Sequence, residues 1–376
     1  MNSRKFLLIC VSMCMLLGCS NQSEGDSGKN TKSEQDVTAV LDNIPKTFQR
    51  KDGNVVFDAE VKLNDYDKEK GLVTADAHLQ KIDGEKARTL LWKKKDGKYI
   101  EEGYESENEY GEKIIIMSGS NADNTAQFGA GPYSSTVSYG EMGTSHILGA
   151  FRVQKKDEDY NADKYSLINE LDFMTREDAF SKLESDLKQM GFDFEKEYSA
   201  YALDAETMEK EEYHMSMDGG IDKEEYKEQW TGDDDCYYFV LRQKYGGLPI
   251  HYAYADVFTN YAPENAPVQA IFTKDGIMEL TVDRIYEMSS EEMVEQMIRP
   301  EQAADVASKK YNSILEDNTY KISQIELVYI VDAAKEKGSY ELKPAWILMG
   351  TQSDGKDIQT IIDAQTGKEV ILWTKL

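Results

Sequence analysis

Two stretches in the second half of the chain repeat one order of elements, an amphipathic helix followed by three strand-like segments. The first helical pattern begins at Thr175, with Asp178 three residues later as in a capping box, and ends at Gly191. The second begins at Pro300, a residue favoured in the first turn of a helix. Their apolar stripes are Ala179, Phe180, Leu183, Leu187 and Met190, and Ala304, Ala307, Tyr311 and Leu315. Each stripe has to be buried against another element, and the following strands provide one.

The segments after the two helices also match in their residues. Residues 201–205 and 329–333 both read Tyr, two apolar residues, Asp and Ala, and each copy then reaches a strand that holds a proline, Pro249 or Pro344. Each copy ends with a turn between apolar segments, at 271–276 and 361–367. We therefore predict an α+β fold in which two repeated units, 165–290 and 291–376, each pack one helix on an antiparallel sheet.

A β-rich region, 44–151, is predicted to precede these units. Apolar residues occupy alternate positions from Val55 to Leu63, which is the period of a strand with one buried face. Asp83 is a candidate cap for a short helix, and 114–117 is a further strand candidate. Residues 118–149 are rich in Gly, Ser, Asn and Thr and hold only two charges, so we read them as a loop. Such a loop either packs under another domain or lines a binding surface, or it is a long disordered excursion.

The first unit contains an acidic insert, 206–235. Tyr201 and Pro249 are 48 positions apart, whereas Tyr329 and Pro344 are 15 apart. The insert holds 12 acidic residues and 3 Lys, together with Trp230. It is either a partner surface or cation site, or a solvated helical excursion with Trp230 packed against the sheet.

The N-terminus has the features of an export signal. Arg4 and Lys5 precede a mostly apolar run of about 12 residues, which is shorter than the ~20 needed to span a bilayer. The run ends in Leu-Leu-Gly-Cys19, which resembles the lipobox of bacterial lipoproteins. The resemblance implies a signal peptide at 1–18, cleavage before Cys19 and a lipid on its thiol. An ordinary secretory signal with an incidental Cys is the alternative. Residues 19–43, polar at first, are predicted to form a flexible tether.

Composition excludes some partners and some chemistry. The net charge is −27, and it becomes −29 once Arg4 and Lys5 leave with the signal peptide, which argues against nucleic acid as a partner. Only Cys236 would then remain as an unmodified thiol, so no internal disulfide forms and we expect it to be buried and inert.

No motif in the chain predicts catalysis. The four His residues are isolated in sequence, without an HExxH pair, and there is no G-x-S-x-G motif or Walker-type phosphate loop. A Ser-x-x-Lys match at Ser185 lies within the amphipathic helix, where we read it as helix surface. Calcium is the one cation for which the sequence offers candidate ligands. Its candidate ligands are Asp159, Asn161, Asp163 and Glu170, and, less convincingly, 233–235. Because Lys164 replaces the glycine of such a loop, an acidic linker is the better interpretation, and we predict no cofactor and no metal site.

Short motifs resemble a known domain family. The segment 363–370, preceded by 342–346, resembles the final strands of PepSY-like domains, and 245–250 resembles the middle strands of the YycH/YycI regulators of a cell-wall sensor kinase. The layout is also similar to uncharacterised surface lipoproteins of Gram-positive anaerobes. The resemblance covers roughly 165–376 and implies tandem α+β domains that bind or regulate a surface partner, with no catalytic residues. Those regulators are held by a transmembrane helix, which this chain replaces with a lipobox.

These observations favour a non-enzymatic lipoprotein on the outer face of the cell membrane, anchored through Cys19, that binds or regulates an envelope protein or peptide. The expected contact surfaces are the sheet edges or the acidic insert. The alternatives are an extracytoplasmic hydrolase or processing factor, with a site in 118–149, and a solute-binding lipoprotein.

Overall fold

The computed structural model describes most of the chain after the predicted signal and tether. The described residues are 35–64, 66–92, 100–107, 113–120, 126–141, 170–212, 214, 222–224, 226–252, 266–315, 318–333 and 340–371. All of them belong to one unit, Gln35–Leu376. No helix among them is long and apolar enough to cross a membrane.

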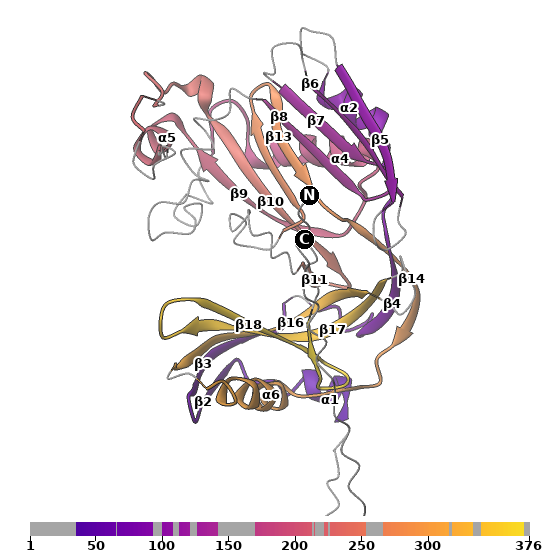
Figure 1. Ribbon diagram of the computed structural model, residues 1–376, viewed down its shortest axis with the longest axis vertical. Helices are drawn as coiled ribbons and strands as arrows, with labels where there is room; N and C mark the ends of the chain where they lie inside the picture. The colour runs from indigo at the N-terminus through magenta and orange to yellow at the C-terminus, as the bar shows by residue number, and fades with distance from the viewer. Residues whose placement is uncertain are drawn as a thin grey trace, which may run out of the picture. The chain divides into compact units, whose positions relative to one another are not determined.

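The fold is mixed α+β, as predicted, and its strands are mostly antiparallel (Figure 1). Five helices are described: α1 (Val37–Leu41), α2 (Gly84–Leu91), α4 (Arg176–Met190), α5 (Ala205–Glu211) and α6 (Pro300–Asn312). A short 3₁₀ helix, Gly232–Asp234, precedes β10. Two small strands, β1 (Gln35–Asp36) and β15 (Gln296–Met297), pair with each other.

Eight strands form an antiparallel sheet, which we call sheet I. Its order is β5-β6-β7-β8-β13-β12-β10-β9. The strands are β5 (Ile100–Glu107), β6 (Lys113–Ser120), β7 (Ala126–Gly131), β8 (Thr136–Glu141), β9 (Lys196–Leu203), β10 (Cys236–Tyr245), β12 (Val268–Thr273) and β13 (Gly276–Val282). Within the described residues, β9 is therefore one edge of the sheet.

The remaining strands form sheet II around a long hairpin of β16 (Tyr320–Ala333) and β17 (Tyr340–Gln352). Both β3 and β11 pair with β16 in the parallel direction, and β18 and β4 pair with β17. The outer pairs are β2 with β3, β14 with β4, and β19 with β18. The strands are β2 (Thr47–Asp52), β3 (Val55–Lys62), β4 (Val73–Leu79), β11 (Leu248–His251), β14 (Tyr286–Met293), β18 (Asp357–Asp363) and β19 (Glu369–Val370).

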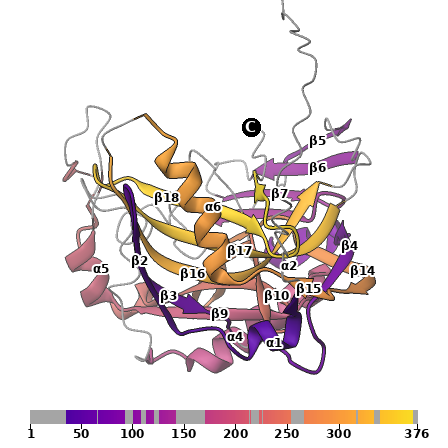
Figure 2. The same cartoon turned by 90° about the horizontal axis from the view of Figure 1, so that it is seen from below.

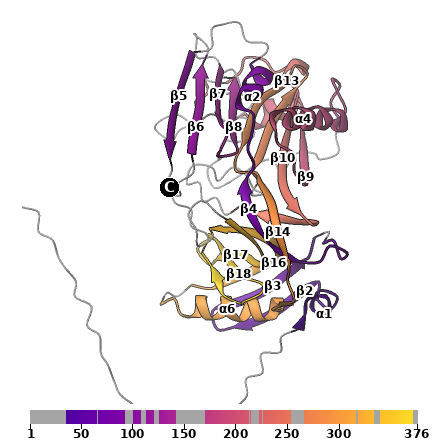
Figure 3. The ribbon, with the colours of Figure 1, turned by 90° about the vertical axis from the view of Figure 1, so that its right-hand side faces the viewer.

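Helices α2 and α4 cover one face of sheet I, and Figure 3 shows them on the same side. The Thr175 side chain caps α4 by accepting from the Asp178 N–H, and Gly191 ends the helix at φ 100°. Its buried stripe is Ala179, Leu183, Leu187 and Met190, which packs with Tyr237, Phe239 and Leu241 of β10. Asp83 caps α2 in the same way, as predicted.

Helix α6 packs on sheet II, and Figure 2 shows it lying across the strands. Pro300 is its first residue, as predicted, but the helix ends at Asn312, so Leu315 is outside it and fully exposed. Arg50 of β2 pairs with Asp305 at 2.6 Å, which fastens α6 to the β2–β3 hairpin. The alternating residues of β3 fill the core beneath: Val55, Phe57, Ala59 and Val61 are all buried, as the sequence predicts.

Sheets I and II are linked where β10 turns into β11. Gly246 and Gly247 make this turn at φ 54° and 82°, the left-handed region that glycine tolerates best. Their N–H groups donate to the Glu195 carboxylate at 3.0 Å. Close by, the buried Gln243 amide accepts from the Tyr286 N–H and donates to the Tyr286 carbonyl, which ties β10 to β14.

Two assignments made from sequence change in the structure. Residues 37–41, predicted as part of the tether, form α1, because Val37, Val40 and Leu41 are buried in the core of sheet II. Part of the predicted loop 118–149 is ordered as the β7–β8 hairpin, in which Phe128 and Tyr139 pack beneath α2 and α4. The strands of the β-rich region 44–151 are divided between both sheets.

The matched motifs of the two predicted units do not occupy equivalent positions. Tyr201 points to the face of sheet I opposite α4, whereas Tyr329 points toward α6, so the two strands are one residue out of register. Pro249 lies in β11 of sheet II, whereas the strand that follows β9 in sheet I is β10. The two repeated helix-on-sheet units are therefore not shown. Along the chain, α4 is followed by β9, α5 and β10 to β13, and α6 is followed by β16 to β19.

Candidate functional site

The candidate site is a groove between α4 and the edge strand β9. At its centre the rings of Phe180 and Tyr198 stack, with centroids 3.7 Å apart and an angle of 13° between planes. Tyr198 is 37% exposed, one of few large apolar side chains in the described residues that reach the surface to this extent. The groove is wide open to solvent and has a volume of about 590 Å³. It is lined by Phe180, Glu184, Lys188, Asp193, Phe194, Glu195, Lys196 and Tyr198.

Periodicity along both elements places these side chains together. Phe180 and Glu184 are four residues apart, so they lie on one face of α4 at the border of its buried stripe. Along β9, Lys196, Tyr198 and Ala200 alternate toward the helix, with Ala200 in the core and Tyr198 at its margin. The stacked rings thus form an apolar floor where the covered part of the sheet ends.

Charged side chains form the rim of the groove. Lys196 donates to Glu184 at 2.9 Å and its side chain is only 8% exposed, while Lys188 lies 3.5 Å from the same carboxylate. The hydrogen bond from Lys196 holds the pKa of Glu184 below its ordinary value, against the opposing effect of partial burial. Both ammonium groups are therefore already paired with Glu184, and Asp193 and Glu195 add negative charge to the rim.

Tyr198 lies in a negative field. Burial is the largest cause that raises the pKa of its hydroxyl, and the nearby carboxylates of Glu177 and Glu170 raise it further, with Arg176 opposing them. The opening of the groove is therefore more favourable to a cation than to an anion.

The outer edge of β9 has backbone groups that no described strand pairs with. Within the part of the chain that the structure describes, β9 pairs only with β10. The Lys244 N–H donates to the Glu195 carbonyl at 2.8 Å, which marks these two residues as a hydrogen-bonded pair. Such pairs recur at every second residue of an antiparallel ladder, so the N–H and C=O of Glu197 point toward β10. Those of Lys196 and Tyr198 point toward the open edge.

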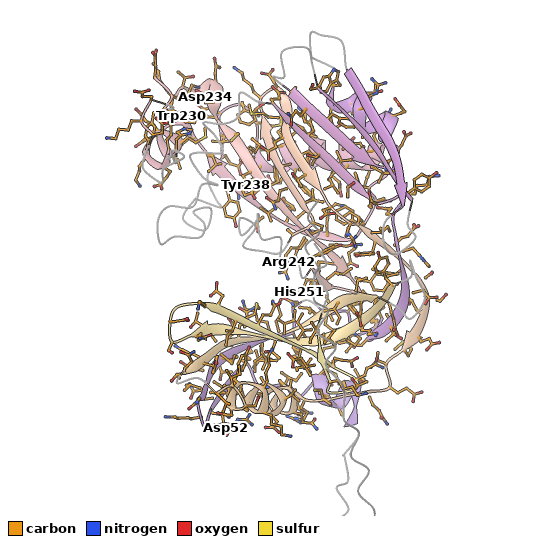
Figure 4. All side chains as sticks on the ribbon, in the orientation of Figure 1. Asp52, Trp230, Asp234, Tyr238, Arg242 and His251 are labelled. Carbon is orange, nitrogen blue, oxygen red and sulfur yellow. The ribbon has the colours of Figure 1, made fainter. Side chains whose placement is uncertain are left out.

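The acidic insert, in contrast, uses many of its carboxylates internally. The Glu212 side chain is 2% exposed and accepts from the Lys227 N–H, the Trp230 indole and His214 at 2.8–2.9 Å. Burial alone would raise the pKa of Glu212, but these three donors hold it below its usual value. Trp230 is buried with Met208 over β9 and β10, and Figure 4 shows it on the part of the insert beside Asp234. The described part of the insert thus fits the packed excursion better than the cation site.

Residues 233–235 are also engaged within the chain. Asp233 pairs with Lys274, Asp234 pairs with Lys227, and Asp235 accepts from the Ala205 N–H at 2.9 Å. Asp234 completes a capping box with Thr231 in the 3₁₀ helix. These carboxylates stabilise the turn before β10, and no metal-binding group of His, Cys, Asp and Glu occurs among the described residues.

The other candidates from the sequence fall into two classes. Cys19, Asp159, Asn161, Asp163 and His146 lie outside the described residues. Glu170 accepts from the Arg176 N–H and from the Tyr237 hydroxyl, so its carboxylate fixes the start of α4. Ser185 is exposed on α4, as predicted.

The remaining polar candidates are structural. Cys236 is fully buried and burial raises its pKa, in agreement with an inert thiol. His251 is buried in β11, with Nε2 3.4 Å from Gln359, and burial lowers its pKa to about 4. Figure 4 shows that His251 is separate from Trp230 and Asp234 of the insert.

The sequence indicated sheet edges as contact surfaces but did not identify β9. A partial signal was present, because 196–199 is polar on both faces except at Tyr198, whereas 200–203 is apolar throughout. Such a strand is buried at one end and accessible at the other. Which strand would be an edge depends on the sheet order, which no local pattern contains.

No protein-family model and no curated protein sequence matches the chain. An uncharacterized protein from Eubacterium rectale, solved at 1.45 Å resolution, is similar in structure, with 16% identity, a TM-score of 0.57, and coverage of 88% of this chain and 94% of that one. This likeness shows a shared fold. The C-terminal domain of Bacillus megaterium YpeB matches 77% of this chain and 96% of its own length at 14% identity, but its TM-score of 0.27 is too low to carry an argument.

Proposed function

We propose that this chain is a lipoprotein, anchored through Cys19 to the outer face of the cell membrane, that binds an extended segment of an envelope protein or peptide without catalysing a reaction. The observation that carries the binding function is the open edge of β9 beside the Phe180–Tyr198 stack. An extended peptide adds to such an edge through main-chain hydrogen bonds, and a groove for alternate side chains gives specificity.

The organisation of the chain supports a binding function rather than catalysis. We further propose that α4 and α6, each with its four strands, are PepSY-like units, on the basis of the motif resemblance and the common order of elements. In the described residues, polar side chains near the groove and in the insert hold local structure, as with the exposed Glu170 and the buried Glu212. Neither the groove nor the described part of the insert brings together the nucleophile, the base and the oxyanion donors that a hydrolase needs.

Lipidation is tested by metabolic labelling of cells with an alkyne fatty acid. The full chain should become labelled, and Cys19→Ser should remain unlabelled while Cys236→Ser is labelled normally, because burial makes Cys236 inaccessible. Labelling of the Cys19→Ser variant would contradict the anchor.

Partner binding is tested by photocrosslinking in the native host. A benzoylphenylalanine in place of Tyr198 should yield a discrete crosslinked product, because its side chain opens into the groove. The matched control places the same group at Lys309, on the exposed face of α6. Identical products, or none at either position, would contradict the proposal that β9 is the binding edge.

A further inference from the structure

The molecule contains its own example of strand addition next to a helix. In sheet II the first strand after α6 is β16, and β3 pairs with it in the parallel direction from Tyr320 opposite Val55 to Glu326 opposite Lys62. Helix α6 contacts β3 as well as β17 and β18. The added strand thus extends the sheet under the helix, and its alternate side chains enter the same core.

The sequence of β3 shows which residue pattern suits a strand that is added beneath a helix. Its buried residues Val55, Phe57, Ala59 and Val61 face α6, while Asp58 and Glu60 between them are exposed. Alternation of this kind fixes the register, because a slip by one residue would turn the apolar set to solvent. A strand with this pattern gains both the backbone ladder and burial under a helix.

Among the residues that the structure describes, the corresponding edge in sheet I has no such strand. The first strand after α4 is β9, and within the described residues only β10 pairs with it. The N–H and C=O of Lys196 and Tyr198 point to the open side, and the Phe180–Tyr198 rings lie beside them under α4. The position is equivalent to that of β3 on β16, since in both cases it adjoins the first strand after the helix.

The strand that we expect at this edge differs from β3 in charge. The groove is lined by three carboxylates and two ammonium groups, and both ammonium groups are paired with Glu184. Behind the strand, Glu197 is balanced by Arg242 at 3.3 Å. The chain as a whole carries −27, so an acidic strand would be repelled and a basic one attracted.

We propose that the β9 edge receives a basic extended segment of a partner, about five residues long, that runs parallel to β9 with apolar side chains at alternate positions under α4 and Lys or Arg between them. This inference rests on the proposed function and adds the orientation, pattern and charge of the ligand. The apolar side chains contact Phe180 and Tyr198 on the α4 side, and the basic ones point to the opposite face of the sheet, as Asp58 and Glu60 of β3 do in sheet II.

The probe is a fluorescein-labelled peptide, Lys-Val-Lys-Phe-Lys-Ala-Lys-Val-Lys, which alternates the apolar residues of β3 with Lys. Binding is measured by anisotropy on the mature chain, residues 19–376, that carries Cys19→Ser. We expect it to bind about tenfold more tightly than a peptide of the same composition with its apolar residues adjacent. Equal binding of the two would overturn the alternating pattern. A peptide with Glu in place of Lys should not bind, and if it binds as well as the first, the charge assignment fails.

Two variants at one position separate the backbone from the side chain. Tyr198→Ala removes the ring, whereas Tyr198→Pro removes the ring and also the outward N–H, without removing a ladder bond to β10. We expect the Pro variant to bind about three- to tenfold more weakly than the Ala variant. Equal affinities would overturn strand addition at this edge. Circular dichroism of both variants checks that the fold is retained, and Gln189→Pro, inside α4, is the control for a backbone disruption that unfolds the helix.

Orientation is read from a photoreactive group on the N-terminal residue of the peptide. Parallel addition predicts crosslinks to residues 193–196, at the beginning of β9, and crosslinks to 200–204 instead would overturn it. Dimerisation of the chain that Tyr198→Pro abolishes would also overturn the proposal, since a second copy would then be the occupant. If crosslinking at Tyr198 in cells captures a partner but the peptides fail, only the present inference falls. If the cellular crosslink fails as well, the proposed function falls with it.

Discussion

Sheets I and II differ at the outer side of the first strand that follows the helix, which is β9 after α4 and β16 after α6. In sheet II the edge of β16 is covered by β3, and Tyr320, Ile322 and Ile325 of β16 are fully or almost fully buried. In sheet I the equivalent half of β9 is paired on one side only within the described part of the chain, and Tyr198 remains 37% exposed. An exposed strand edge invites uncontrolled pairing, and proteins commonly protect it with charges. On β9, Lys196 and Glu197 provide such charges, and Tyr198 next to them stays accessible.

The difference shows that an added strand is compatible with this fold. The helix that lies over the added strand differs between the two cases, because α6 presents Ala303, Ala304 and Ala307 to the core, whereas α4 presents Phe180 at the groove. Small residues allow α6 to lie close to β3, which it contacts. The larger ring of Phe180 on α4 lies at the open groove beside β9, where we propose that a partner binds.

The largest effect is expected from breaking the covered edge. Phe57 is 2% exposed, packs edge-on against Phe48 at 5.4 Å and lies under the Arg50 guanidinium. Phe57→Ala should lower the free energy of unfolding by about 3–5 kcal/mol, since it removes a buried ring and leaves a cavity. Urea denaturation measures this loss. Val56→Ala, on the other face of β3, is the control and should cost less than half as much. A loss below about 1 kcal/mol for Phe57→Ala would show that β3 is not integral to the core.

A smaller effect is expected at the link between the sheets. Gln243→Met keeps the volume of the side chain but removes the acceptor of the Tyr286 N–H and the donor to the Tyr286 carbonyl, both in a buried site. Unsatisfied buried groups of this kind cost about 1–3 kcal/mol. Gln189→Met on the exposed face of α4 should change stability by less than about 0.5 kcal/mol. Similar values for the two variants would mean that the linking hydrogen bonds contribute little.

Local signals in the sequence predicted α2, α4 and the first residue of α6, and they predicted strands at β3 and β6. Each of the caps at Asp83, Thr175 and Gly191 depends only on residues a few positions away along the chain. The alternation in β3 depends on burial of one face of the strand. The β7–β8 hairpin was missed because its glycines and serines resemble a loop, although Phe128 and Tyr139 alternate toward the core. The loop-like composition of β7 and β8 concealed the alternation of buried and exposed positions that is typical of a strand.

The sequence predicted that a sheet edge would be a contact surface, but not which strand would form it. Pairing of β3 with β16 joins residues more than 250 positions apart and in the parallel direction, so no window of sequence contains it. The matched residues Tyr201 and Tyr329 even point to opposite faces of their sheets, which a residue-by-residue comparison cannot detect. Because edges are defined by such long-range pairings, β9 could be recognised as an edge only after the sheet order was known.

The insert beside β9 is expected to respond to pH. The pKa of Glu212 is lowered in the folded chain by its three donors, so its contribution to stability is present above the unfolded value of about 4.3 and is lost as pH falls below it. Glu212→Gln should therefore destabilise the chain by about 1–2 kcal/mol at pH 7 and by less at pH 3. Thermal unfolding at both pH values measures this, with exposed Glu209→Gln as control. An equal loss at both pH values would contradict the charged role of Glu212.

The smallest effect distinguishes the two edges without changing stability at all. In β9 the Tyr198 N–H points to the open side and should exchange with solvent near the unprotected rate. The Glu197 N–H points to β10 and should exchange at least about a hundredfold more slowly. In β16, with β3 on one side and β17 on the other, the successive amides of Ile325 and Glu326 should both be protected. Residue-resolved hydrogen exchange by NMR measures these rates. Alternating protection in β9 and continuous protection in β16 would confirm the comparison, and equal protection of Tyr198 and Glu197 would show that another segment already occupies the edge.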